Sequence, residues 1–145
     1  MKSLKTPLRY PGGKSRAITK MSRFLPDMNK YKEYREPFLG GGSVALYITK
    51  TYPHLEVWVN DLYEPLANFW QQLQHEPDEI TTRLKIFKTK YPTPDRAREL
   101  FLESKELVND EGASLVTRAV SFYIVNKCSF SGLTESSSFS KQASD

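Results

Sequence analysis

Two clusters of glycine mark the parts of this chain where backbone atoms could approach a ligand closely. The first, Gly12 and Gly13, lies in the segment LRYPGGKSR at residues 8–16, and the second runs from Gly40 to Gly42. Glycine has no side chain, so it lets the backbone turn sharply or pass close to a bound group. Both clusters are therefore candidates for ligand-binding loops, and the residues around each decide which ligand is chemically reasonable.

The second cluster has the pattern of a nucleoside-binding loop. Gly40, Gly42 and Ala45 satisfy G-x-G-x-x-A between a predicted strand and a predicted helix. Asp61 lies nineteen residues after Gly42, at the end of the next predicted strand. A carboxylate there can accept hydrogen bonds from ribose hydroxyls. The pattern favours a nucleoside-containing cofactor; the alternative is a tight turn, with Asp61 capping the next helix.

The first cluster does not fit a triphosphate-binding loop. That loop requires G-x-x-x-x-G-K-[ST], and the position of its first glycine is occupied here by Leu8. Two interpretations remain for this segment. It is a turn before a helix with Lys14 on the surface, or Tyr10 supplies an aromatic face and Lys14 a charge to a pocket formed elsewhere.

The predicted elements begin as an α/β fold and continue as a run of helices. Apolar spacing and breaker residues predict strands over 34–39 and 55–59, and helices over 14–25, 43–51, from Pro65, 77–90, 96–109 and 115–125. The second strand is predicted to be buried, with Trp58 and Trp70 in the core. Two strands are too few for a complete doubly wound sheet, so the sheet is expected to be incomplete.

Composition and charge narrow the function classes. The 145 residues are 39% hydrophobic and 26% charged, which is typical of a globular domain. Residues 1–35 hold ten Lys or Arg and two acids, a distribution that suits contact with a polyanion such as nucleic acid or simply a solvated basic face. The single cysteine, Cys128, favours a reducing, cytoplasmic setting. His54 and His75 are isolated, so no metal site is predicted.

Three motifs resemble those of one enzyme family in order and spacing. They are R-Y-P-G-G-K at 9–14, E-P-F-L-G-G-G-S-V at 36–44 and N-D at 60–61. The chain resembles the Dam-type (D12 class) DNA adenine methyltransferases, which use S-adenosylmethionine to methylate the exocyclic amine of adenine in duplex DNA. The resemblance implies a Rossmann-like methyltransferase fold, here with an incomplete sheet, and an inserted helical target-recognition domain. Residues 1–62 would begin the cofactor-binding domain, and 63–145 would form the recognition domain.

The same resemblance implies cofactor-binding roles for five residues. Tyr10 and Lys14 would contact S-adenosylmethionine, with Lys14 near its carboxylate. Phe38 and Gly40 would form the floor under the methionine and adenosine, and Asp61 would hold the ribose hydroxyls. The Gly loop and Asp61 alone fit a nicotinamide dinucleotide equally well, so the choice of cofactor depends on the family.

A hairpin near the end of the chain resembles the DNA-reading segment of the family. The family pattern N-R-x-x-[FY]-N-G-L-x-R corresponds to N-K-C-S-F-S-G-L-T-E at 126–135. The DNA-binding residues expected from it are Asn126, Lys127, Phe130, Ser131 and Leu133. Phe130 could stack on or wedge between bases. Ser131 and Glu135 depart from the pattern, and because Glu cannot read guanine as Arg does, a G-A-T-C target is not implied.

The family's catalytic motif, [DN]-P-P-Y, does not occur in the 145 residues. The chain is therefore expected to be the N-terminal part of a longer enzyme, or to work with a second chain that supplies the missing segment. Two alternatives stay open: a non-catalytic DNA-binding remnant of such an enzyme, and a nicotinamide-dependent oxidoreductase fragment. The second leaves the Tyr-Pro-Gly-Gly-Lys segment unexplained.

Overall fold

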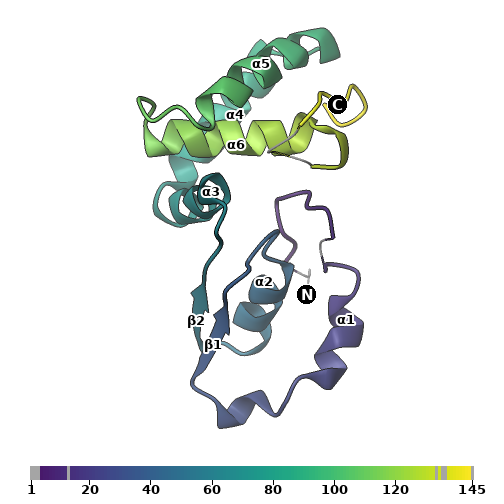
Figure 1. Ribbon diagram of the computed structural model, residues 1–145, viewed down its shortest axis with the longest axis vertical. Coiled ribbons are helices and arrows are strands. Elements are labelled where there is room, and N and C mark those ends of the chain that lie inside the picture. The colour runs from purple at the N-terminus through teal and green to yellow at the C-terminus, as the bar shows by residue number, and fades with distance from the viewer. Residues whose placement is uncertain (1–3, 13, 133, 135–136, 145) are drawn as a thin grey trace. The chain divides into compact units, whose positions relative to one another are not determined.

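The computed structural model describes residues 4–12, 14–132, 134 and 137–144. The chain divides into two compact units, Met1–Leu62 and Tyr63–Asp145, which we call the N-terminal and C-terminal units (Figure 1). The N-terminal unit is mixed α/β and the C-terminal unit is helical. The predicted change from an α/β opening to a run of helices is therefore observed.

A small parallel sheet forms the centre of the N-terminal unit. Strands β1 (Glu33–Glu36) and β2 (Glu56–Val59) pair in parallel, with Glu33 opposite Glu56 and Glu36 opposite Val59. Parallel neighbours need a crossover, and helix α2 (Ser43–Thr51) provides it, with the predicted bounds. Strand β1 is shorter than the predicted 34–39 because Pro37 has no N–H to continue the ladder.

The sheet buries one face and exposes the other. Met28, Ile48 and Leu55 form the buried core, with Tyr34 and Val57 packed against it. Side chains alternate between the faces of a strand, so Trp58 points away from this core and is 55% exposed. The prediction of a buried second strand with Trp58 in the core was therefore wrong. The apolar run at 55–59 predicted burial on both faces of the strand. Among the described residues, the core packs against only one face.

The first predicted helix is also shorter than expected. Residues 14–25 were predicted to be helical, but α1 covers only Ile18–Met21 and is followed by the 3₁₀ turns η1 (Ser22–Phe24) and η2 (Met28–Lys30). None of the α1 side chains is buried, and Phe24 is 87% exposed. A short helix gains most of its stability from packing of an apolar face, so periodicity alone overestimated its length.

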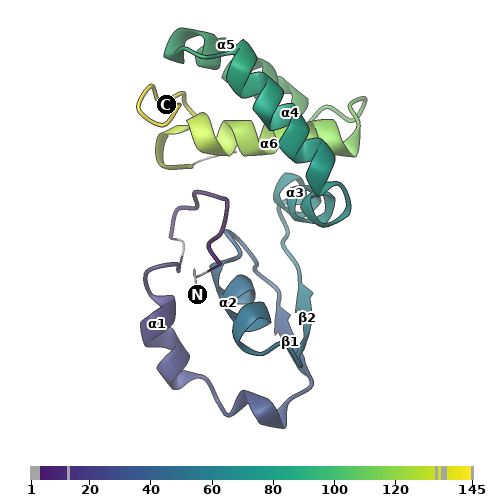
Figure 2. The same cartoon turned by 180° about the vertical axis from the view of Figure 1, so that it is seen from behind.

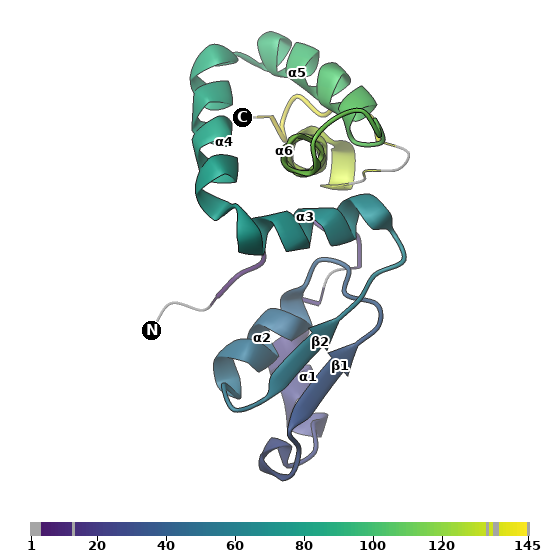
Figure 3. The ribbon, with the colours of Figure 1, turned by 90° about the vertical axis from the view of Figure 1, so that its left-hand side faces the viewer.

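In the described part of the C-terminal unit there are four α-helices. They are α3 (Glu64–His75), α4 (Pro77–Lys90), α5 (Pro94–Leu107) and α6 (Leu115–Cys128). Each of the first three carries proline in its first turn, where the missing N–H has no cost. Figure 3 looks along α6 and shows α3, α4 and α5 around it. The predicted helix over 115–125 is confirmed and extends to Cys128.

Helix α6 is the core element of this unit. Seven of its residues are buried, and the Phe122 ring lies 5.6 Å from that of Phe69 on α3. Polar contacts join the same two helices: Asn68 Nδ2 donates to the Leu115 carbonyl, and Arg118 pairs with Glu64 at 2.5 Å. The apolar spacing of 115–125 thus reflects burial among three neighbouring helices.

The segment after α6 folds back on the bundle. The 3₁₀ turn η3 (Phe130–Gly132) follows, and an isolated antiparallel bridge pairs Ser129 with Phe139. Figure 2 shows this return segment, in yellow, beside the end of α6. The Phe139 ring lies 5.6 Å from Phe101 on α5, and Lys105 Nζ donates to the Ser137 carbonyl. A return of the chain at this point agrees with the predicted loop or hairpin.

No helix in the described part of the chain is both long enough and apolar enough to cross a bilayer.

Candidate functional site

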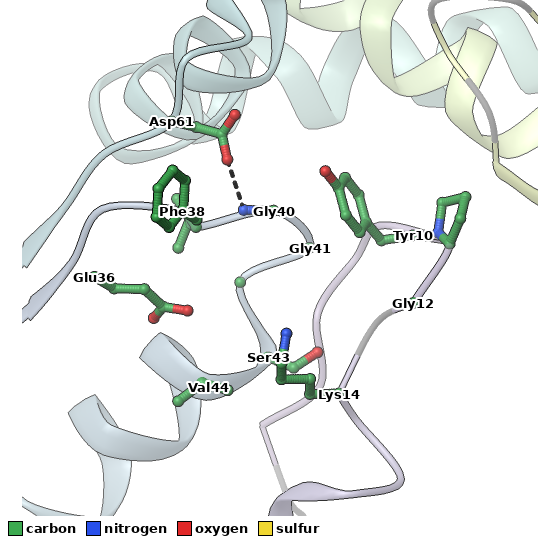
Figure 4. Close-up of a pocket in the computed structure, with 13 residues that line it drawn as sticks. Tyr10, Gly12, Lys14, Glu36, Phe38, Gly40, Gly41, Ser43, Val44 and Asp61 are labelled. Atoms are coloured by element: carbon green, nitrogen blue, oxygen red, sulfur yellow. Dashed lines mark hydrogen bonds between the residues drawn. The ribbon is translucent and has the colours of Figure 1, made fainter.

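A cavity of about 360 Å³ lies at the carboxyl ends of the two strands, within the N-terminal unit. It is lined by the glycine loop, the N-terminal segment and the ends of both strands (Figure 4): Tyr10, Pro11, Gly12, Lys14, Glu36, Phe38, Leu39, Gly40, Gly41, Gly42, Ser43, Val44 and Asp61. The carboxyl edge of an open α/β sheet is where such folds bind ligands.

The glycine loop takes a backbone path that other residues would not follow easily. Gly40 and Gly42 have φ of 54° and 74°, in the left-handed region. Gly41 is required for a different reason. A Cβ on Gly41 would lie 2.8 Å from the Tyr10 Cβ, closer than real contacts allow. The loop and the N-terminal segment therefore pack directly against each other, as the second interpretation of LRYPGGKSR expects.

Asp61 joins the end of β2 to the glycine loop. Its Oδ2 accepts a hydrogen bond of 2.9 Å from the Gly40 N–H. The next helix, α3, has Tyr63 as its N-cap residue and no side-chain cap hydrogen bond, so Asp61 does not serve as its cap. Asp61 thus fixes the glycine loop at the end of β2. A carboxylate is also the type of group that accepts hydrogen bonds from hydroxyls.

Glu36 and Lys14 add a carboxylate and an ammonium group to the lining of the cavity. Burial raises the pKa of the Glu36 carboxyl, while a hydrogen bond from Tyr34, the charge of Lys14 and the Ala45 backbone N–H oppose the rise. Tyr34 donates to Glu36 Oε2 at 3.3 Å, and burial followed by the Glu36 charge raises its own pKa to about 12. The cavity thus offers one cation and one partly desolvated carboxylate, besides Asp61.

Phe38 supplies an apolar surface at the mouth of the cavity. Its side chain is 82% exposed although it is a large aromatic residue. Figure 4 shows Phe38 and Asp61 on one side of Gly40 and Tyr10 on the other. Ligand-binding pockets commonly combine apolar and aromatic lining side chains with a few well-placed polar groups.

All five residues predicted to bind the cofactor line this one cavity: Tyr10, Lys14, Phe38, Gly40 and Asp61. Glu36 lines it too but was not predicted. Its position at the end of β1, immediately before the glycine loop, was the signal that could have identified it, because ligands bind at that edge. The described residues contain no group of His, Cys, Asp and Glu arranged to hold a metal ion.

Of the predicted DNA-binding residues, Asn126 and Lys127 lie at the end of α6, and Phe130 and Ser131 lie in η3. Phe130 is 64% exposed. Asn126 is 1% exposed, and its Nδ2 donates to the Gly132 carbonyl, so it supports the turn that carries Phe130. Lys127 Nζ lies 5.4 Å from the centre of the Tyr123 ring. Leu133 and the side chain of Ser131 lie outside the described residues.

Comparison with known protein families shows to which family the chain belongs. The model of the D12 class N6 adenine-specific DNA methyltransferases matches residues 10–144. The chain belongs to this family. The match includes the glycine loop, Asp61, the helical unit and the segment after α6. Members of the family are methyltransferases, so a methyl donor is implied for the chain.

Individual relatives agree with the family match. The chain is 26% identical over 133 residues to the Type II methyltransferase M.MjaIII of Methanocaldococcus jannaschii, covering 87% of this chain and 46% of that protein. It is 31% identical over 126 residues to the DNA N-6-adenine-methyltransferase of Escherichia phage P1, covering 87% of this chain and 15% of that protein. It is 29% identical over 133 residues to a DNA adenine methylase of Vibrio cholerae, covering 92% of this chain and 44% of that protein. The chain thus spans less than half the length of these relatives.

Proposed function

We propose that this chain provides the cofactor-binding and DNA-recognition parts of an enzyme that transfers a methyl group from S-adenosylmethionine to the N6 amine of adenine in duplex DNA. The observation that carries the proposal is that Tyr10, Lys14, the glycine loop and Asp61 line one cavity. The family match and the names of the relatives support the same reaction. The N-terminal unit is then the start of a Rossmann-like sheet, and the C-terminal unit an inserted recognition domain.

The residues present fit the chemistry of this cofactor. S-adenosylmethionine combines a ribose, an adenine ring, a carboxylate and an ammonium group, and supplies a methyl group from a positively charged sulfur. The cavity offers a matching set: the Asp61 carboxylate for ribose hydroxyls, and Lys14 for the carboxylate. Glu36 is suited to the ammonium group, and the Phe38 ring to the flat adenine.

The glycine loop has two tasks in this scheme. Gly40 gives its N–H to Asp61, which fixes the carboxylate at the end of β2. Gly41 lets Tyr10 approach the loop, so the N-terminal segment closes one side of the cavity. In this scheme the residues of the loop bind and orient the donor.

Recognition of DNA is assigned to η3 and the end of α6. Phe130 presents its exposed ring for stacking on a base, a contact that costs about 1–3 kcal/mol per base when it is removed. Asn126 has an indirect role: its side chain donates to the Gly132 carbonyl and so stabilises the turn that carries Phe130. Lys127 contributes positive charge beside them. Ser131 and Leu133 complete the predicted reading segment.

The cofactor assignment is tested by replacing Asp61 with asparagine. Asp61→Asn keeps the size of the side chain but removes the charged acceptor, so affinity for S-adenosylmethionine should fall about tenfold or more. Titration calorimetry on the 145-residue chain measures this directly. The matched control is Glu56→Gln on the exposed side of β2, which removes the same charge outside the cavity and should leave the affinity unchanged.

Two outcomes would contradict the assignment. Equal affinities for wild type and Asp61→Asn would show that Asp61 does not contact the ribose. Tight binding of a nicotinamide dinucleotide, with no binding of S-adenosylmethionine, would reject the methyl donor itself.

A further inference from the structure

A second cavity lies within the C-terminal unit, away from the proposed cofactor residues in the sequence. It has a volume of about 580 Å³ and is formed by the end of α4, the start of α5 and the end of α6. We call it the α4–α6 cavity. The residues that matter chemically are Lys88, Tyr91, Tyr123 and Lys127, with Phe87 among the apolar lining.

The α4–α6 cavity is positively charged. Two lysines line it, Lys88 and Lys127, and no Asp or Glu is among its described lining residues. Burial, with a smaller effect of Cys128, raises the pKa of Tyr123, so this phenol stays neutral at physiological pH. Another cavity of the same bundle, of about 180 Å³, is lined by Arg83 and Lys90 together with Glu103. The described lining of the α4–α6 cavity therefore differs from that of the smaller cavity in having lysines without an acidic residue.

Two rings of the lining, those of Tyr91 and Tyr123, contact cations, and of these cations Lys127 is among the described lining residues of the cavity, whereas Lys90 and Arg96 are not. Lys127 Nζ lies 5.4 Å from the centre of the Tyr123 ring. Lys90 Nζ and the Arg96 guanidinium lie 5.3 and 5.4 Å from the centre of the Tyr91 ring. Contacts of this kind orient a flexible cation without neutralising it. The Arg96 guanidinium also pairs with the Glu99 carboxylate at 3.2 Å.

The shape and the charge together identify a class of ligand. Lysines that line a groove attract the phosphates of a nucleic-acid backbone, and such contacts supply the sequence-independent part of the affinity for duplex DNA. Lys127 is three residues before Phe130, the ring that we assign to base stacking. The cavity is lined by Lys127 and Cys128, the last residues of α6, which the chain follows into η3.

We propose that the α4–α6 cavity binds the sugar–phosphate backbone of duplex DNA next to the bases that η3 reads, with Lys88 as a phosphate contact. This inference rests on the proposed function, because it takes DNA as the substrate. It adds a contact surface on α4 and the α4–α5 turn that the three sequence motifs do not include. Contacts to phosphate position the protein on the duplex without reading its sequence.

The salt dependence of DNA binding tests this surface. The affinity for duplex DNA falls with salt, and each phosphate contact adds about 0.9 to the magnitude of the slope of log affinity against log salt concentration. Lys88→Gln should therefore reduce the magnitude of this slope by about 0.9 for the 145-residue chain, for matched and unrelated duplexes alike. Fluorescence anisotropy with a labelled duplex, between about 50 and 200 mM salt, measures the slope.

Lys85→Gln is the matched control. Lys85 is exposed on the same helix, carries the same charge and does not line the α4–α6 cavity. Its slope should equal that of wild type, which separates a contact at the cavity from a general loss of positive charge. Thermal unfolding monitored by circular dichroism checks that both variants remain folded.

The outcomes separate this inference from the proposed function. If Lys88→Gln and Lys85→Gln have the wild-type slope while the wild type binds DNA, the α4–α6 cavity is not a phosphate site and the proposed function stands. If both variants lower the slope equally, the effect is one of net charge and the inference fails. If the wild type binds no duplex DNA, although it binds S-adenosylmethionine, the recognition role fails and this surface fails with it.

Discussion

The two units of this chain use apolar residues in different ways. In the C-terminal unit, three phenylalanines, Phe69, Phe101 and Phe122, are each 1% exposed. In the N-terminal unit the core cluster consists of Met28, Ile48 and Leu55, and large side chains such as Phe38 and Trp58 are exposed. The helical unit is therefore stabilised by its own core. The N-terminal unit instead places much of its apolar and glycine content around a cavity and on an open sheet face.

This contrast predicts where a mutation changes stability and where it changes binding. Substitutions inside the bundle should mainly affect unfolding of the C-terminal unit. Substitutions around the glycine loop should mainly affect the ligand. Three variants test the difference, beginning with the largest effect.

Phe122→Ala should produce the largest loss of stability. The ring is buried on α6 and contacts those of Phe69 and Tyr63 at centroid distances of 5.6 and 6.2 Å. Removing such a ring leaves a cavity and costs about 3–5 kcal/mol. Urea unfolding followed by the helical circular dichroism signal measures the change.

The control for this variant is Ile86→Ala on α4, where the side chain is 57% exposed. Its effect should stay within about 0.5 kcal/mol, because little buried surface is lost. Similar losses for both variants would show that the bundle does not depend on the α6 core.

Gly41→Ala should weaken cofactor binding without changing the unfolding of the helical bundle. The added methyl group would lie 2.8 Å from the Tyr10 Cβ, so the N-terminal segment must move away from the loop. Overpacking of this kind costs about 1–3 kcal/mol, and displacement of Tyr10 should weaken S-adenosylmethionine binding by about tenfold. Calorimetric titration gives the affinity, and the unfolding of the bundle should not change.

Gly112→Ala in the C-terminal unit serves as the comparison. There the new methyl group meets only the Asp110 Oδ1 atom, at 3.2 Å on a side chain. Cofactor affinity should equal that of wild type. A loss of affinity as large as that of Gly41→Ala would break the assignment of binding to the glycine loop.

Glu36→Gln should have the smallest effect, and its size depends on pH. Because burial raises the pKa of Glu36 above its ordinary value, the folded state holds this proton more tightly than the unfolded state. Stability therefore falls as pH rises from the ordinary pKa through the raised one. Glutamine does not ionise, so without cofactor the variant should melt slightly higher than wild type at pH 7, and this advantage should disappear in acid. A wild type that is more stable than the variant at pH 7 would contradict this.

Local sequence patterns predicted the regular elements well. The predicted bounds of α2 and α4 agree with the structure, because breaker residues and proline mark their ends. Apolar periodicity was less reliable for segments whose apolar side chains do not pack against another described element. Residues 14–25 have helical spacing but form only the short α1, and the apolar run that ends at Val59 forms a strand with an exposed face.

The candidate site was predictable where a motif fixes backbone geometry, and less so where it depends on tertiary contacts. Spacing identified Gly40 and Asp61, which the structure joins by a hydrogen bond. Tyr10 was connected to the same cavity through family resemblance, since no local pattern shows that it packs on Gly41. The burial of Asn126 and the partly desolvated carboxyl of Glu36 depend on residues distant in sequence, so neither could be read from its own segment.

The hydrogen bond between Gly40 and Asp61 depends on the register of the two strands. Gly40 follows β1 and Asp61 follows β2, so their contact exists only while Glu36 stays opposite Val59. A slip of one residue would move one partner by about 3.3 Å along the sheet and separate the donor from the acceptor. Cofactor affinity would then report misfolding of this small sheet even where the helical content of the chain is unchanged.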